Sequence, residues 1–144
     1  MPALSLQIDA IVTVLIERHP EWGDQRRATG ACRAAACLLA DQLHRAGGIP
    51  FAILKGEKAP PGSPRAECFH HAVEVEGVVV DLTYRQFVSD APWPRVTSRE
   101  MFNADWGRVE SYAFGSGEWL SRQPCQGLRE CEEAALHPEL LRRS

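Results

Sequence analysis

Two apolar runs that flank a Glu-Gly dipeptide constrain the fold of this chain more than any other feature. The segment FHHAVEVEGVVVDLTY, residues 69 to 84, is rich in β-branched and aromatic residues on both sides of Glu76-Gly77. Short runs of this composition, separated by a glycine-containing turn, predict a β-hairpin. PFAILK, residues 50 to 55, predicts a strand before the hairpin, and RVESYAF, residues 108 to 114, predicts one after it. We therefore expect a small antiparallel sheet.

The segments that precede the sheet have the periodicity of amphipathic helices. Residues 5 to 18 place apolar side chains at the spacing of one helical face. A second helix is expected from about residue 30 to 46, with Thr29 as its N-cap and Gly47-Gly48 as its end. Helices followed by an antiparallel sheet predict the α+β class.

Two shorter helical patterns follow the hairpin. Residues 97 to 106 predict a helix that begins with a Thr97/Glu100 capping box, and residues 126 to 143 predict another. The chain has no internal repeat and no linker long enough to divide it. With 144 residues and 44% hydrophobic residues, it fits a single domain that spans residues 1 to 144.

Composition excludes several partners. The formal net charge is -3, and the basic residues form no stripe that would follow phosphates, so we expect no nucleic-acid partner. The longest apolar run near the N-terminus, AIVTVLI, contains Thr13 and lies between Asp9 and Glu17. It is too short and its flanks are too acidic for a signal peptide or a membrane span. We expect a soluble protein that carries no secretion signal of its own and has no membrane partner.

The five cysteines are odd in number and irregularly spaced. In a chain able to build its own core, this pattern predicts free thiols in a reducing compartment rather than a disulfide framework. The expected location is therefore the cytoplasm; delivery into a target cell by a secretion system, the alternative location, would leave no mark in these residues.

Cys32 differs from the other cysteines by its position in the first turn of the predicted second helix. Unpaired backbone N–H groups and the positive end of the helix dipole favour an anion there, so the pKa of a thiol is lowered. A nucleophilic thiolate also needs a histidine to exchange its proton and a third group to orient that histidine. His71 and Asp81 can fill these roles if they lie on the same face of the hairpin.

The hairpin register decides whether His71 and Asp81 meet. A two-residue loop at Glu76-Gly77 pairs Val75 with Val78 and places Asp81 on the face opposite to His71. A three-residue loop that includes Val75 places His71 directly opposite Asp81, and Gly77 suits the last position of such a loop. The sequence mildly favours the three-residue loop, although both registers stay open. In that register His70 faces the other side of the sheet, where a surface or loop-anchoring role is expected.

Metal binding is the competing use of these residues. None of the cysteines forms a C-x-x-C pair, so we expect no structural metal site. A zinc nucleobase deaminase needs H-x-E followed by P-C-x-x-C. His71 is followed by Ala72 and Val73, and the Pro124-Cys125 pair has no second cysteine at the required spacing, so this interpretation fails.

A cysteine at the start of a helix, followed by HHAVEVEG and VVVDLTYRQF, resembles the papain-like and transglutaminase-like thiol hydrolases. The short spacing and the DLTYRQF ending are most similar to papain-like domains of bacterial toxins and effectors, several of which deamidate protein glutamines. The similarity covers residues 28 to 90. It implies a papain-like fold, a catalytic triad of Cys32, His71 and Asp81, and a mechanism that uses no cofactor and no metal.

The resemblance also implies the substrate. A protein of a host or competitor cell would be deamidated at a glutamine side chain, and a toxin of this kind would have a cognate immunity or inhibitor protein. Peptide cleavage and transglutamination share the same acyl-enzyme and remain alternatives, as does a non-catalytic binding module on the same fold. The backbone amide of Cys32 is expected to hold the oxyanion, and Gln25 is a candidate second donor.

Overall fold

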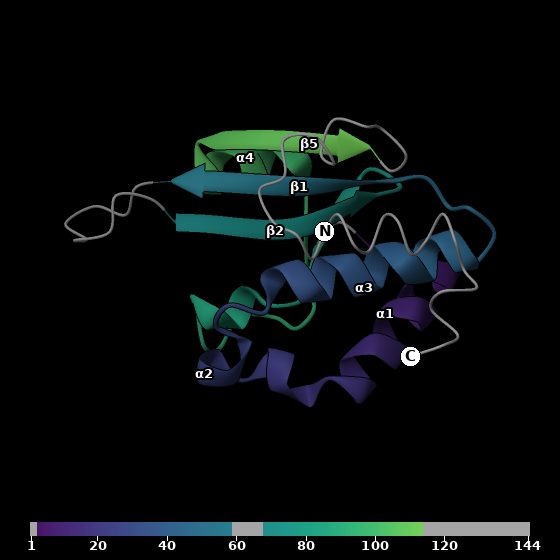
Figure 1. The fold of residues 1–144 in the computed structure, drawn as a ribbon, viewed down its shortest axis with the longest axis horizontal. Helices are drawn as coiled ribbons and strands as arrows, with labels where there is room; N and C mark the ends of the chain where they lie inside the picture. The colour runs from purple at the N-terminus through teal and green to yellow at the C-terminus, as the bar shows by residue number, and fades with distance from the viewer. Residues whose placement is uncertain (1–2, 59–67, 114–144) are drawn as a thin grey trace.

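The computed structural model describes residues 3–58 and 68–113. These residues form a five-stranded antiparallel sheet with the strand order β4-β3-β2-β1-β5, and helices pack on it (Figure 1). The strands are β1 (Phe51–Lys58), β2 (Cys68–Val75), β3 (Val78–Asp81), β4 (Arg95–Thr97) and β5 (Arg108–Ala113). The predicted α+β class is confirmed.

The two long helices form where the apolar periodicity predicts them. α1 (Leu6–Arg18) is capped by Ser5, whose hydroxyl accepts the Ile8 N–H at 3.4 Å. α3 (Cys32–Arg45) ends before Gly47 and Gly48, which have φ angles of 110° and 73°. Glycine adopts this left-handed conformation without steric cost, which is why the helix stops there.

Shorter helical segments complete the described part of the chain. They are η1 (Pro20–Gly23), α2 (Gln25–Ala28), η2 (Tyr84–Gln86) and α4 (Arg99–Trp106). Two predicted caps were wrong. Ser98 rather than Thr97 caps α4, because its hydroxyl accepts the Met101 N–H at 3.1 Å. Thr29 ends α2, and Ala31 stands at the N-cap of α3 without a side-chain hydrogen bond. The helix predicted over residues 126 to 143 lies outside the described residues.

Both faces of the sheet are buried. One face packs against α3, and α1 packs against α3 in turn (Figure 1). The core on this side includes Ile53, Val73, Val80 and Tyr112. The other face packs against α4 through a smaller core. That core consists of Leu54, Ala72, Val79, Phe102 and Trp106. In the described residues, no helix is long and apolar enough to cross a membrane.

The β2–β3 hairpin has the two-residue loop, so the predicted preference for a three-residue loop was wrong. Val75 pairs with Val78, and both Glu76 and Gly77 have positive φ angles, 50° and 80°. Two consecutive positive φ values are those of a type I′ turn, whose twist matches that of the two strands. Asp81 therefore lies on the α4 face of the sheet, while His71 lies on the α3 face.

Candidate functional site

Cys32 is the first residue of α3, as predicted, and its thiol is free and buried. The chain reaches it through Gly30, which has a φ angle of 81°. The Gly30 N–H donates to the side-chain oxygen of Gln86 at 3.4 Å, and this bond ties the loop before the helix to η2. The thiol thus lies beside the unpaired N–H groups at the N-terminus of the helix.

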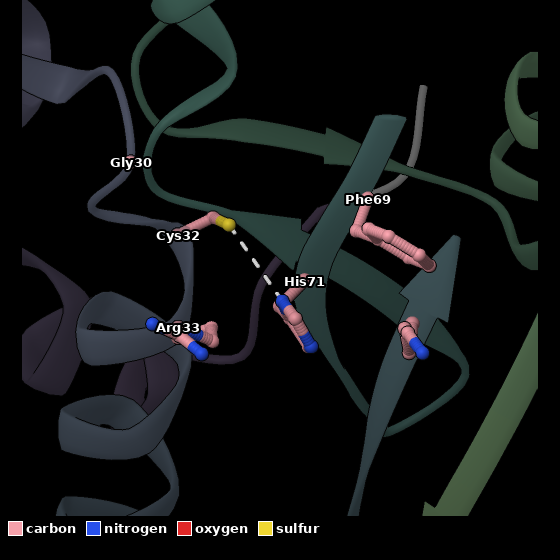
Figure 2. A pocket seen from close by; sticks show the side chains of 6 residues that line it. Gly30, Cys32, Arg33, Phe69 and His71 are labelled. Atoms are coloured by element: carbon pink, nitrogen blue, oxygen red, sulfur yellow. Dashed lines mark hydrogen bonds between the residues drawn. The ribbon is translucent and has the colours of Figure 1, made fainter. Parts of the chain in front are cut away.

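The structure brings Cys32 and His71 together. The Cys32 Sγ lies 3.6 Å from His71 Nδ1, across the gap between α3 and β2 (Figure 2). β3 pairs with β2 only from Val73 to Val75. His70 and His71 therefore extend past the last strand pair on that side, and the N-terminus of α3 occupies this end of the sheet.

Asp81 contacts His70 and not His71, so its predicted role as the group that orients His71 was wrong. The His70 Nε2 lies 2.5 Å from the Asp81 Oδ2, and the second carboxylate oxygen accepts the Thr83 N–H at 3.1 Å. The physical reason is the hairpin register. Side chains alternate across a strand, so the two-residue loop puts Asp81 on the same face as His70.

His70 is fully buried, which corrects the surface or loop-anchoring role predicted for it. Its ring stacks on Trp106 with a centroid distance of 5.1 Å and meets the edge of Phe87 at 4.9 Å. Trp106 reaches the ring because Gly56, the β1 partner of His70, has no side chain. A Cβ at Gly56 would lie 2.4 Å from the Trp106 Cγ.

The two histidines have opposite electrostatic environments. Burial by itself lowers the pKa of His70, but the Asp81 carboxylate and the Cys32 sulfur outweigh it and raise the pKa to about 9. Burial and the nearby positive charges of His70, Lys55 and Arg33 lower the pKa of His71 to about 3. His71 is therefore neutral at physiological pH, and its Nε2 is buried without a hydrogen-bond partner. His70 is a cation paired with Asp81.

The segment DLTYRQF, residues 81 to 87, supplies most of the support around His70. Asp81 binds the ring, Phe87 packs against it, and the Gln86 Nε2 lies 3.5 Å from its Nδ1. The Gln86 amide also donates to the Thr83 hydroxyl at 3.2 Å. Sequence reasoning did not identify Gln86 as a site residue, although its place in this segment was a usable signal.

Gln25, the predicted second oxyanion donor, does not reach the site. It is the exposed first residue of α2, and it is not among the residues that line the cavity beside Cys32. That cavity has a volume of about 260 Å³ (Figure 2). Its lining consists of Gly30, Cys32, Arg33, Lys55, Phe69 and His71. Sequence reasoning did not single out Arg33 or Lys55, because their approach to Cys32 depends on how α3 packs on β1 and β2.

The cysteines are not all free thiols. Cys37 is disulfide-bonded, so the free-thiol prediction was wrong for this residue, while Cys32 is free. Within residues 3–58 and 68–113, no group of three or more His, Cys, Asp or Glu side chains is arranged to hold a metal ion.

Comparisons of the chain with protein-family models, with curated proteins and with solved structures found no match.

Proposed function

We propose that this protein is a thiol-dependent acyl-transfer hydrolase with a papain-like arrangement of its site. Cys32 is the nucleophile, His70 is the general acid and base, and Asp81 orients His70. The observation that carries the proposal is the free Cys32 thiol at the N-terminus of α3, whose sulfur helps to raise the pKa of His70, the histidine that is paired with the Asp81 carboxylate. Nucleophile, base and orienting group are the three parts that covalent acyl transfer requires.

His70 suits the acid-base role better than His71, although the Cys32 Sγ lies 3.6 Å from the His71 Nδ1. A pKa of about 9 allows His70 to stay protonated beside a thiolate and to protonate a leaving group at neutral pH. A pKa of about 3 leaves His71 neutral rather than an imidazolium at neutral pH, so it is a poor general acid there. Asp81 occupies the His70 Nε2, so Nδ1 is the nitrogen that exchanges a proton with sulfur and substrate.

In the first half of the reaction, the Cys32 thiolate attacks a carboxamide carbonyl and forms a tetrahedral oxyanion. The backbone N–H groups at the start of α3 are the nearest fixed donors for that oxyanion. His70 then gives its proton to the departing nitrogen, the C–N bond breaks, and ammonia leaves behind a thioester on Cys32.

In the second half, His70 removes a proton from water as the water oxygen attacks the thioester. The C–S bond breaks, the product leaves as a carboxylic acid that gives its proton to the solvent, and the Cys32 thiolate and protonated His70 are restored. We place deamidation of a protein glutamine first, because of the resemblance to papain-like deamidases, and peptide cleavage second. An amine in place of water would give transglutamination by the same steps.

Selective alkylation of Cys32 tests the proposal. At about pH 6 an ordinary thiol is almost wholly protonated, so iodoacetamide reacts slowly with it. Cys32 is expected to react about a hundredfold faster than a cysteine in an unstructured peptide, as measured by peptide mass spectrometry over time. A Cys32 rate equal to that of the peptide would contradict an activated nucleophile and favour a non-catalytic binding module.

The reaction itself is tested with a matched pair of proteins. Wild type and Cys32→Ala are incubated with a cell lysate, and glutamine-to-glutamate conversion and new peptide termini are mapped. Conversion with wild type alone supports deamidation, and new termini with wild type alone support proteolysis. Equal maps for the two proteins would count against both activities.

A further inference from the structure

The cavity beside Cys32 is lined by positive charge. Of the residues that form it, Arg33 and Lys55 are the charged ones at neutral pH, and no Asp or Glu is among them. Arg33 comes from the first turn of α3, next to the thiol, and Lys55 comes from β1, directly opposite His71 on β2. Two elements thus bring two cations to the lining of the cavity that contains the nucleophile.

Neither cation forms an ion pair with a carboxylate within the described residues. The Lys55 ammonium lies 4.4 Å from the centre of the Phe69 ring, a contact that leaves its charge available to a ligand. Glu110 is the direct partner of Lys55 on β5, and its carboxylate lies 3.9 Å from Arg108, while Glu57 lies 4.0 Å from Arg108. The lining of the cavity itself therefore carries two cations and no carboxylate.

His71 gives a second, independent indication of a ligand. Its side chain lines the cavity and is only 4% exposed, yet its Nε2 has no hydrogen-bond partner. Buried polar atoms in proteins are nearly always paired, so an unpaired one in a cavity wall is a place for a ligand group. Burial lowers the pKa of His71 most, and the positive charges of His70, Lys55 and Arg33 lower it further.

We infer that the acyl donor is an acidic peptide segment, with a carboxylate close to the carbonyl that Cys32 attacks. Arg33 and Lys55 bind that carboxylate and hold the carbonyl over the sulfur. The inference rests on the proposed function, because it names the substrate class of the same site. A carboxylate fits better than a nucleic acid, since two cations in a cavity of about 260 Å³ do not form the continuous basic surface that a phosphate backbone requires.

Two reagents that differ in charge test this inference on the thiol itself. Iodoacetate is an anion and iodoacetamide is neutral, and both alkylate Cys32. For Cys32, the rate with iodoacetate divided by the rate with iodoacetamide is expected to be well above the same ratio for a cysteine in an unstructured peptide. Arg33→Gln and Lys55→Gln should each lower the ratio about fivefold, and added salt should lower it in the wild type.

Arg45→Gln is the matched control, because it removes the same charge from the other end of α3. Arg45 lies about 18 Å along the helix from Arg33, beyond the range of screened electrostatics. Its rate ratio should equal that of the wild type. A wild-type ratio equal to that of the free peptide, or one that neither Arg33→Gln nor Lys55→Gln changes, would overturn the inference.

This design separates the inference from the proposed function. The rate with neutral iodoacetamide reports whether the thiol is activated, and the ratio of the two reagents reports whether the cavity attracts anions. A slow reaction with iodoacetamide together with a high rate ratio would contradict the proposed hydrolase and support the anion-binding cavity. A fast reaction with iodoacetamide together with a rate ratio equal to that of the free peptide would support the activated thiol and contradict the anion-binding cavity.

Peptide protection then distinguishes the source of the carboxylate. A glutamine peptide flanked by aspartates should protect Cys32 from iodoacetamide at about a tenfold lower concentration than the same peptide flanked by asparagines. Lys55→Gln should remove that difference. Equal protection by the two peptides, or none by either, would overturn the acidic-peptide assignment, and so would stronger protection by N-acetylglutamine, whose carboxylate is not on a peptide.

Discussion

His70 and His71 are neighbours in the chain, yet they lie in two regions of the molecule with opposite properties. His70 faces α4, is fully buried and contacts a carboxylate at 2.5 Å, and its pKa is about 9. His71 faces α3 and the cavity, has an unpaired Nε2, and its pKa is about 3. Burial disfavours the charged form of both rings, so it is the neighbouring charge that makes them differ.

The comparison shows how one short segment can supply two chemical functions. Because side chains alternate across a strand, adjacent residues face different environments. The Cys32 sulfur contacts the His71 ring and helps to raise the pKa of His70. The proposed site thus combines a protonated histidine from one face with a neutral histidine in the cavity wall from the other.

The largest expected effect is on the pH dependence of stability. The pKa of His70 rises from 6.5 to about 9 on folding, so its contribution is fully present below pH 6.5 and is lost as the pH rises to about 9. The loss is on the order of 3 kcal/mol. The pKa of His71 falls from 6.5 to about 3, so its contribution is present above pH 6.5 and is lost as the pH falls. The free energy of unfolding should therefore peak near pH 6.5, as measured by urea unfolding.

Single variants show which histidine causes the loss of stability at alkaline pH (the alkaline limb of the profile) and at acid pH (the acid limb). His70→Gln should flatten the alkaline limb, and His71→Gln should reduce the acid limb, to which several carboxylates also contribute. If the alkaline limb is unchanged in His70→Gln, the pairing of His70 with Asp81 is not what stabilises its charge.

The next effect is on thiol reactivity. His70→Gln should lower the rate at which iodoacetamide alkylates Cys32 at about pH 6 roughly a hundredfold, since the thiolate loses its imidazolium partner. His71→Gln should stay within about threefold of the wild type, because a neutral ring adds little to the thiolate fraction. The opposite ranking of the two variants would transfer the acid-base role to His71 and end the present assignment.

Asp81→Asn sharpens the role of the carboxylate. The asparagine carbonyl can still accept the Thr83 N–H, but its amide donates to the His70 Nε2 and so forces the proton onto Nδ1. His70 then cannot accept a proton from the thiol, and we expect about a tenfold lower alkylation rate. The thermal midpoint serves as the control for folding. A wild-type rate in a folded Asp81→Asn protein would show that Asp81 is structural only.

The smallest expected effect is the difference in Cys32 alkylation rate between two glutamine variants. Gln86→Ala removes the amide near the His70 Nδ1 and the acceptor of the Gly30 N–H, so the alkylation rate should fall about threefold. Gln25→Ala changes an exposed side chain outside the cavity and should leave the rate unchanged. A larger fall in the alkylation rate for Gln25→Ala than for Gln86→Ala would restore Gln25 as the candidate second oxyanion donor.

Much of this arrangement was predictable from local patterns. The spacing of apolar residues marked α1 and α3, and Gly47-Gly48 marked the end of α3. The place of Cys32 at a helix start depended only on these patterns, and so it was predicted correctly. The side chains within a few positions of a residue decide such features, and the sequence contains them directly.

The hairpin register was not predictable in the same way. Alternation of apolar and polar residues identifies the buried face when the other face meets water. Here both faces are buried, so Val79 and Val80 point into different cores and the pattern does not reveal which face Asp81 shares. A shift of one residue exchanges the two histidines as partners of Asp81. Gln86, Arg33 and Lys55 were missed because their contacts join segments far apart in the chain.

The sequence by itself determined the kinds of element, their order and a cysteine in the field of a helix N-terminus, because these depend on neighbouring residues. The tertiary structure alone decided that Asp81 binds His70, that His71 stays neutral, and that Arg33 and Lys55 line one cavity with the thiol. These outcomes depend on strand register and on the packing of α3 against β1 and β2. Both are set by the fit of two buried cores rather than by any local pattern.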